Sequence, residues 1–218
     1  DREALTLLEG SKGIKNYFMA DDIVYNLPAD LLRNPKERTG LGISCYRSIR
    51  PGEINYQNYQ ALAALADRYV QETGKKVFLF SFDSEGENDL AAAHHILNLS
   101  REKDMIEIIP YLGDDAYFLD RFSRCERLIA IRFHSAILAD ICQIPFLPVA
   151  YSNKMFNLME DRGFQGLSLK LSELTLALDL DMLTQAIIDG GQLFDRFIGD
   201  QHTAALHFNQ LEALLEGS

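Results

Sequence analysis

Residues 124–154 read RCERLIAIRFHSAILADICQIPFLPVAYSNK, with two short apolar runs on either side of a segment of helical character. The runs at 128–131 and 146–150 are rich in aliphatic residues, as buried strands are, and residues 134–142 between them predict a short helix. A strand, a helix and a second strand in this order form a βαβ unit, whose two strands lie parallel. The stretch therefore predicts part of a parallel sheet.

The same alternation extends in both directions from this unit. Three further strands are predicted upstream, at 41–45, 77–80 and 105–109. Helical patterns connect or follow the strands, at 56–73, 87–99, 114–123 and 153–161, and two more near the C-terminus, at 181–188 and 192–215, are expected to pack across the sheet. This order predicts an α/β domain over residues 40–218, built as a doubly wound parallel sheet with C-terminal helices.

The first 39 residues fit this scheme less well. A helix at 1–9 and a strand at 17–19 are predicted, followed by a polar loop at 33–39. We interpret residues 1–39 as the remnant of a preceding N-terminal domain, or as the linker from it.

Composition and charge argue against a nucleic-acid-binding protein and against an integral membrane protein. The chain has 218 residues, 47% of them apolar, and its 32 acidic and 21 basic residues give a net charge of −11, which disfavours nucleic acid as a partner. Cys45, Cys125 and Cys142 include no CxxC pair, as expected of reduced thiols in a cytosolic protein. No apolar stretch approaches the ~20 residues of a membrane span, so no integral membrane segment is expected. The sequence thus indicates a cytoplasmic protein, with peripheral attachment at the inner face of the membrane left open.

Basic and polar residues follow several of the predicted strands. Arg47 comes after the first strand, Arg132 after the fourth, and Tyr151 and Lys154 after the fifth. Ligands of open parallel sheets bind at the carboxyl ends of the strands, so these residues would meet at one rim. Positive groups gathered there in an acidic chain would select a small anion.

The segment Arg132-Phe-His-Ser135 is the sharpest local feature. If the chain stays extended there, Arg132 and His134 point to one side and Phe133 points away, while Ser135 and the N–H groups of the following helix add capacity for an anion. The alternative is that His134 is a polar residue that starts a helix and Arg132 is a surface ion-pair partner. The spacing alone leaves both interpretations open.

Other common catalytic patterns do not occur. The sequence has no GxGxxG after a strand, no GxxxxGK[ST], no GxSxG and no metal-ligand spacing of Cys and His. Neither a metal ion nor a cofactor is therefore expected.

The stretch 124–154 resembles the signature segment of the polysaccharide pyruvyl transferase family. That segment has a strand ending in Arg-(Leu/Phe)-His-(Ser/Ala), an aliphatic helix, a turn and strand with Pro, and then Tyr with Lys shortly after. This sequence has Arg132, His134, Ser135, Tyr151 and Lys154 at those places. The opening, with Asp1, Leu5, Leu8, Gly13 and Leu27-Pro28, is similar to the middle of family members, so the chain looks like their C-terminal, donor-binding half. The family's acidic residue matches either Asp83 or Asp89.

The resemblance implies a Rossmann-like, GT-B-type domain that transfers pyruvate from phosphoenolpyruvate to hexose hydroxyls as a ketal, in exopolysaccharide or cell-wall glycan biosynthesis. It implies His134 as the general acid, and Arg47, Arg132, Ser135, Tyr151 and Lys154 as substrate-binding residues. The implied partners are phosphoenolpyruvate and a saccharide acceptor, free or lipid-linked, and a homo-oligomer is left open.

Two other functions remain open at this stage. One is a GT-B-type glycosyltransferase or sugar-epimerase-like domain that binds a nucleotide sugar at the same rim. The other is a non-catalytic interaction module, in which the acidic surface and the C-terminal helices serve assembly.

Overall fold

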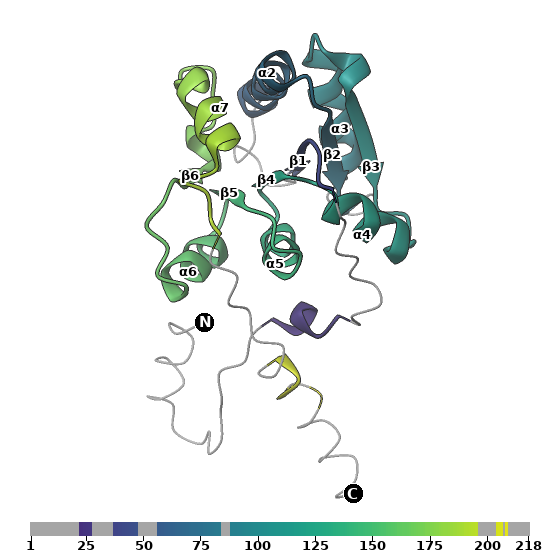
Figure 1. Ribbon diagram of the computed structural model, residues 1–218, viewed down its shortest axis with the longest axis vertical. Helices are drawn as coiled ribbons and strands as arrows, with labels where there is room; N and C mark the ends of the chain where they lie inside the picture. Colours follow the sequence, from purple (N-terminus) through teal and green to yellow (C-terminus); the bar gives the residue numbers. More distant parts are fainter. Residues whose placement is uncertain are drawn as a thin grey trace, which may run out of the picture.

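A parallel sheet forms the centre of the computed structural model, which describes residues 22–27, 37–47, 56–83, 88–195, 204–206 and 208. The sheet has six strands in the order β3-β2-β1-β4-β5-β6, and every neighbouring pair is parallel. Its strands are β1 (Leu41–Ser44), β2 (Val77–Ser81), β3 (Ile106–Pro110), β4 (Arg127–Ala130), β5 (Phe146–Ala150) and β6 (Leu169–Lys170). Figure 1 shows them side by side through the middle of the molecule.

Helices cover both faces of the sheet (Figure 1). One layer contains α2 (Tyr56–Thr73), α3 (Asp89–Leu99) and α7 (Leu180–Asp189), and the opposite layer contains α4 (Asp115–Ser123), α5 (Phe133–Ile141) and α6 (Asn153–Asp161). Short 3-10 turns, η1 (Ile23–Asn26), η2 (Lys103–Met105) and η3 (Leu171–Glu173), complete the elements. The doubly wound α/β fold predicted from the sequence is confirmed.

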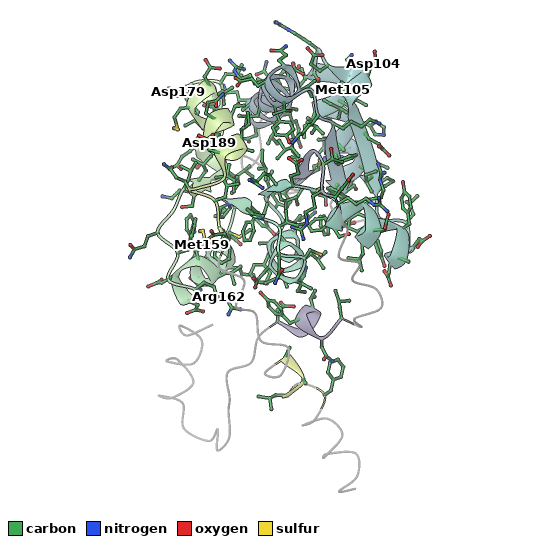
Figure 2. The ribbon with its side chains drawn as sticks, viewed as in Figure 1. Asp104, Met105, Met159, Arg162, Asp179 and Asp189 are labelled. Atoms are coloured by element: carbon green, nitrogen blue, oxygen red, sulfur yellow. The ribbon has the colours of Figure 1, made fainter. Side chains whose placement is uncertain are left out.

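The strands supply one apolar core on each face because successive side chains of a strand alternate between the two faces. In β2, Leu79 packs in the core beneath α2, α3 and α7, whereas Phe80 packs in the core beneath α4, α5 and α6. The side chains of strands and helices fill the space between the layers (Figure 2). This burial on both faces explains why the strands read as continuous apolar runs.

The three cysteines are buried free thiols. Burial raises the pKa of the Cys142 thiol to about 11. None of the described helices is both long and apolar enough to cross a membrane.

The chain after α7 differs from the prediction. The expected helix at 192–215 does not begin at residue 192, because Phe194 instead forms an antiparallel bridge with Phe146 of β5. The two rings stack with centroids 4.7 Å apart, and Phe194 is fully buried. Burial of this ring at the sheet outweighs the helical pattern of the sequence around it. Strand β6, with only two residues, was also not predicted.

Of the first 39 residues, the structure describes 22–27, which contain η1, and 37–39. Asp22 caps this turn by accepting a hydrogen bond from the Val24 N–H, and the turn packs against α5, where the Tyr25 hydroxyl donates to Asp140. The helix predicted at 1–9 and the strand predicted at 17–19 lie outside the described residues. The division of the chain at residues 39 and 40 remains a prediction.

The strand order places a topological switch between β1 and β4. The connections from β1 lead toward β2 on one side, and those from β4 lead toward β5 on the other. Loops diverge at such a point and leave a crevice at the carboxyl ends of the strands. A ligand site is therefore expected where Ser44 and Ala130 end their strands.

Candidate functional site

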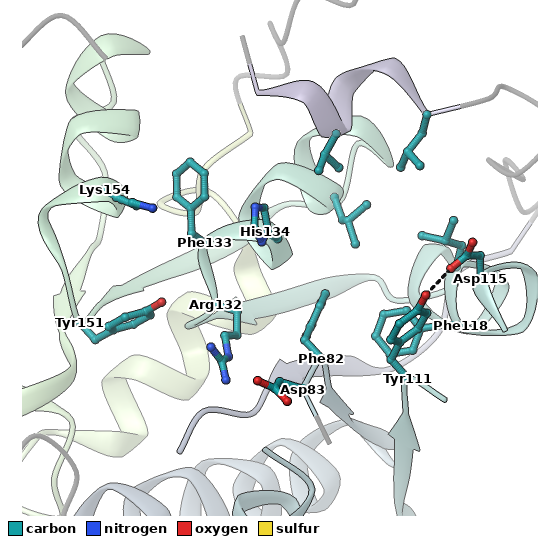
Figure 3. A pocket seen from close by; sticks show the side chains of 14 residues that line it. Phe82, Asp83, Tyr111, Asp115, Phe118, Arg132, Phe133, His134, Tyr151 and Lys154 are labelled. Carbon is teal, nitrogen blue, oxygen red and sulfur yellow. Dashed lines mark hydrogen bonds between the residues drawn. The ribbon is translucent and has the colours of Figure 1, made fainter. Parts of the chain in front are cut away.

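A cavity of about 470 Å³ opens at this carboxyl edge. Its lining comes from η1, from the ends of β2, β3, β4 and β5, and from α4, α5 and α6. The lining residues are Val24, Leu27, Phe82, Asp83, Tyr111, Asp115, Phe118, Leu119, Arg132, Phe133, His134, Leu138, Tyr151 and Lys154. In Figure 3, Lys154 and Tyr151 lie on one side, Tyr111, Asp115 and Phe118 lie on the other, and Phe82 lies between them.

Arg132 is held in place by a buried ion pair with Asp89, the first residue of α3. The Arg132 Nε and Nη2 atoms lie 2.9 Å from Oδ2 and 2.6 Å from Oδ1 of Asp89. Asp89 is fully buried, and the side chain of Arg132 is only 14% exposed. A two-pronged pair of this kind fixes the plane of the guanidinium as well as its position.

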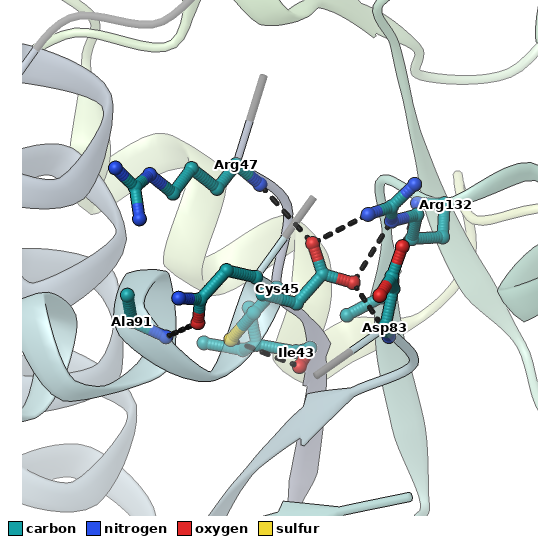
Figure 4. Close-up of polar contacts among 9 residues, drawn as sticks. Ile43, Cys45, Arg47, Asp83, Ala91 and Arg132 are labelled. Carbon is teal, nitrogen blue, oxygen red and sulfur yellow. Dashed lines mark hydrogen bonds and ion pairs between the residues drawn. The ribbon is translucent and has the colours of Figure 1, made fainter. Parts of the chain in front are cut away.

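The Asp89 carboxylate also joins the ends of β1 and β2. It accepts hydrogen bonds from the backbone N–H of Arg47 at 3.2 Å and of Asp83 at 3.1 Å (Figure 4). Burial raises the pKa of Asp89 above its ordinary value, and the Arg132 guanidinium opposes this rise. Of the two acidic residues that the sequence left open, Asp89 binds the arginine and Asp83 lines the cavity.

Two tyrosines support the same arginine. The Arg132 guanidinium carbon lies 4.6 Å from the ring centroid of Tyr46, which follows β1. Tyr46 in turn stacks on Tyr151, with ring centroids 4.1 Å apart. The aromatic face attracts the cation, and the stack connects the ends of β1, β4 and β5.

The N-termini of α5 and α6 face the cavity on its cationic side. Their N-cap residues, Arg132 and Ser152, make no side-chain cap hydrogen bond, whereas α3, α4 and α7 are each capped by an Asn or Asp side chain. His134 and Lys154 are the second residues of α5 and α6, and both are exposed. Uncapped N–H groups and a helix dipole favour an anion at this place.

The structure brings four of the predicted site residues together. Arg132, His134, Tyr151 and Lys154 line the same cavity. Arg132 does pair with a carboxylate, as the alternative interpretation held, but the pair is buried and not on the surface.

Three neighbouring residues lie elsewhere than the sequence predicted. Arg47 does not line the cavity, and in Figure 4 its guanidinium extends away from Arg132, because its backbone N–H is the group that turns toward Asp89. Ser135 is fully buried and its hydroxyl donates to the Arg132 carbonyl at 2.6 Å. Phe133 does not point away, since α5 begins at this residue and the ring joins the cavity wall. The helix starts earlier than the extended-chain argument assumed.

The apolar side of the cavity was not predicted from the sequence. Phe82 follows β2, and Phe118 lies in α4, where its ring meets Phe82 edge to face at a centroid distance of 5.1 Å. Tyr111 and Asp115 stand beside them, joined by a hydrogen bond of 2.7 Å from the phenol. The position of Phe82 and Tyr111 directly after β2 and β3 could have indicated that they lie at this edge. Nothing in the sequence indicated that Phe118 of α4 joins them, because the apolar pattern of this helix is explained by core packing alone.

The described residues contain no group of three or more His, Cys, Asp and Glu side chains that could hold a metal ion.

Solved structures show the same architecture at low sequence identity. S. aureus MnaA, solved with UDP, matches with a TM-score of 0.61 and 13% identity over 98% of this chain and 58% of that one. The UDP-GlcNAc 2-epimerase of Methanocaldococcus jannaschii, solved with UDP-GlcNAc and UDP, matches with a TM-score of 0.58 and 12% identity over 97% and 58%. AviGT4, a glycosyltransferase involved in avilamycin A biosynthesis, matches with a TM-score of 0.50 and 13% identity over 100% and 63%. These likenesses confirm the Rossmann-like, GT-B-type fold, and the chain spans less than two thirds of each structure.

Comparison with families gives a more specific result. The model of the family described as polysaccharide pyruvyl transferase matches residues 2–153, which include Arg132, His134 and Tyr151. Comparison with curated proteins gives no match.

Proposed function

Because the chain belongs to the polysaccharide pyruvyl transferase family, we propose that it transfers the pyruvyl group of phosphoenolpyruvate to two hydroxyls of a hexose. The product is a cyclic ketal on a glycan of the cell surface or on its lipid-linked precursor. The observation that carries the proposal is the cationic side of the cavity, where Arg132, His134 and Lys154 meet the uncapped ends of two helices.

The donor has two anionic groups, a phosphate and a carboxylate. In the proposal they bind at the N-termini of α5 and α6, with Lys154 as an exposed cation and Arg132 as one held by its ion pair. The Asp89 carboxylate balances the charge of Arg132, and Lys154 has no ion-pair partner among the described residues, so Lys154 and the helix ends supply the net positive charge in the proposal. The ion pair holds Arg132 ready before the donor arrives, which lowers the cost of ordering it.

His134 is the proposed general acid. It delivers a proton to C3 of the donor, which becomes the methyl group, while the first hydroxyl oxygen bonds to C2. The second hydroxyl then bonds to C2 as the C–O bond to phosphate breaks. The atoms balance, since one of the two hydroxyl protons replaces the proton that His134 gave and the other leaves with the phosphate. The scheme needs no metal and no further cofactor.

The first turn of α5 suits His134 to this role. The imidazole lines the cavity and has no hydrogen-bond partner among the residues that the structure describes, and its ring centroid lies 5.7 Å from that of Phe133. We propose the cytoplasm as the site of the reaction, since phosphoenolpyruvate is a metabolite of that compartment.

The test is His134→Asn in the full-length protein. Asn is well tolerated near a helix start, so a purely structural histidine predicts a change in turnover of less than about tenfold. The proposal predicts a fall of about 10²-fold or more in turnover, with phosphoenolpyruvate affinity largely kept, measured by ketal formation and by titration calorimetry. Full activity of the Asn variant would mean that the proton comes from another group.

The rival function is binding of a nucleotide sugar at the same edge, which the fold similarity to proteins solved with UDP favours. The same calorimetry separates the two. Binding of UDP or a UDP-sugar in place of phosphoenolpyruvate would favour the rival.

A further inference from the structure

The cavity wall opposite the cations is aromatic and acidic. Phe82, Tyr111 and Phe118 form it, and we call these three residues the aromatic wall. Phe118 meets both other rings edge to face, at centroid distances of 5.1 Å and 5.6 Å. Because Phe118 is 4% exposed and Tyr111 is 38% exposed, the wall has a fixed inner ring and an accessible outer one.

Two carboxylates lie beside these rings. Asp115 accepts a hydrogen bond from the Tyr111 hydroxyl through Oδ1, and Asp83 lies between Phe82 and Arg132 in Figure 3. This hydrogen bond raises the pKa of Tyr111, so the phenol stays the donor. The wall thus combines apolar ring surfaces with hydrogen-bond acceptors.

The size of the cavity leaves room for a second molecule. About 470 Å³ equals the liquid volume of roughly 15 water molecules. Phosphoenolpyruvate, with about ten non-hydrogen atoms, fills only part of that space when it lies against the cations. In the proposed reaction, the acceptor hydroxyls must reach C2 of the donor, so the acceptor has to occupy the adjoining part of the same cavity.

The chemistry of the wall selects among the possible occupants. Asp83 and Asp115 repel a second anion. An acyl chain would displace water from these carboxylates and offer them no hydrogen-bond donor in exchange, at a desolvation cost. An uncharged pyranose has both features that the wall needs, namely a C–H face that packs on an aromatic ring and hydroxyls that donate to carboxylates.

We propose that the aromatic wall with Asp83 and Asp115 is the acceptor subsite, and that it takes an uncharged hexopyranose in preference to a uronic acid or a sugar phosphate. The C–H face of the sugar packs on Phe82 and Tyr111, and its hydroxyls donate to the two carboxylates while pointing toward the donor. This inference rests on the proposed function, since it is the pyruvyl transfer that requires donor and acceptor to be neighbours.

The experiment is saturation-transfer difference NMR on the full-length protein with phosphoenolpyruvate present. The probes are methyl hexopyranosides, the matching methyl hexuronosides and uridine. The wild-type protein is expected to bind an uncharged hexopyranoside and not the uronosides. Phe82→Leu and Tyr111→Leu should each weaken that binding by about fivefold, with phosphoenolpyruvate affinity unchanged. The matched control is Tyr117→Leu, since Tyr117 is an aromatic residue of α4 that is 50% exposed and does not line the cavity.

Asp115→Asn tests the charge argument separately. Loss of this carboxylate should admit the hexuronoside, whereas the wild-type protein excludes it. Tyr111 and Asp115 are both exposed at the surface, so these variants remain informative even if Phe82→Leu fails to fold.

Four results would overturn the inference: no binding of any uncharged hexopyranoside, equal binding of the uronosides, displacement of the sugar by uridine, or equal losses in the Tyr117→Leu control. Failure of the proposed function is recognised separately, because the wild-type protein would then not bind phosphoenolpyruvate at all. If the wild-type protein binds phosphoenolpyruvate but its sugar binding is unchanged by substitutions in the aromatic wall, only the assignment of the acceptor subsite is disproved.

Discussion

Replacement of Arg132 by Gln would leave the Asp89 carboxylate buried without its cationic partner. Asp89 is fully buried and loses two charge-assisted hydrogen bonds, of 2.9 Å and 2.6 Å, but keeps two backbone N–H donors. Breaking a buried pair from one side costs about 3–5 kcal/mol in free energy of unfolding. Because two backbone donors remain, we expect a loss at the lower end of this range, about 3 kcal/mol. For a chain of this size, that lowers the melting temperature by roughly 6–12 °C.

The loss of stability caused by Arg132→Gln should depend on pH in a definite direction. Burial already raises the pKa of Asp89, and Arg132 is the main influence that lowers it, so the substitution raises this pKa further. An acid whose pKa is higher in the folded state than its unfolded value of about 3.9 stabilises the fold most below that value, and this stability is lost as the pH rises through the folded pKa. Lowering the pH from about 7.5 to 5 should therefore reduce the difference in free energy of unfolding between Arg132→Gln and the wild-type protein.

The assay is urea denaturation of four proteins: the wild type, Arg132→Gln, Asp89→Asn and the double variant. An amide in place of the carboxylate removes the buried charge, so the double variant should lose about 2 kcal/mol less than the sum of the two single losses. In the Asn background, the pH dependence should also disappear. A stabilising ion pair between Arg132 and Asp89 is refuted if the losses of the two single variants add to within about 0.5 kcal/mol, or if Arg132→Gln lowers the free energy of unfolding equally at both pH values.

Two further substitutions test the site and the sheet. Lys154→Gln should weaken phosphoenolpyruvate binding by about tenfold or more, because it removes a charge-assisted contact worth about 1.5–3 kcal/mol. The control Arg47→Gln should leave this affinity within about twofold. Equal losses of affinity in titration calorimetry would contradict the assignment of the donor to the cavity. Gly42→Ala should lower the free energy of unfolding by about 1–3 kcal/mol, since its Cβ would lie 2.7 Å from Cδ1 of Leu128. Gly191→Ala, whose Cβ meets nothing within 4 Å, is the control in the same urea experiment, and a Gly42 variant as stable as that control would show that the sheet absorbs the methyl group.

Local sequence determined the elements and their order. The strands β1 to β5 were predicted to within about two residues, because each is a short, mostly apolar run bounded by polar or turn residues. The boundaries of α2 and α6 agree with those predicted. The alternation of strands and helices then left the parallel, doubly wound sheet as the consistent arrangement, and with it the edge where Arg132, His134 and Lys154 lie.

Only the tertiary structure decided what surrounds those residues. Arg132 and Asp89 are 43 positions apart in the chain, and neither the sequence near the arginine nor that near the aspartate shows that they pair. Three other features are likewise contacts between distant segments: the packing of η1 on α5, the bridge at Phe194, and the joining of Phe82 with Phe118 in one wall. Hydrophobic periodicity records which residues are buried, but not which buried residues meet, because burial is a property of one residue and pairing is a property of the packed fold.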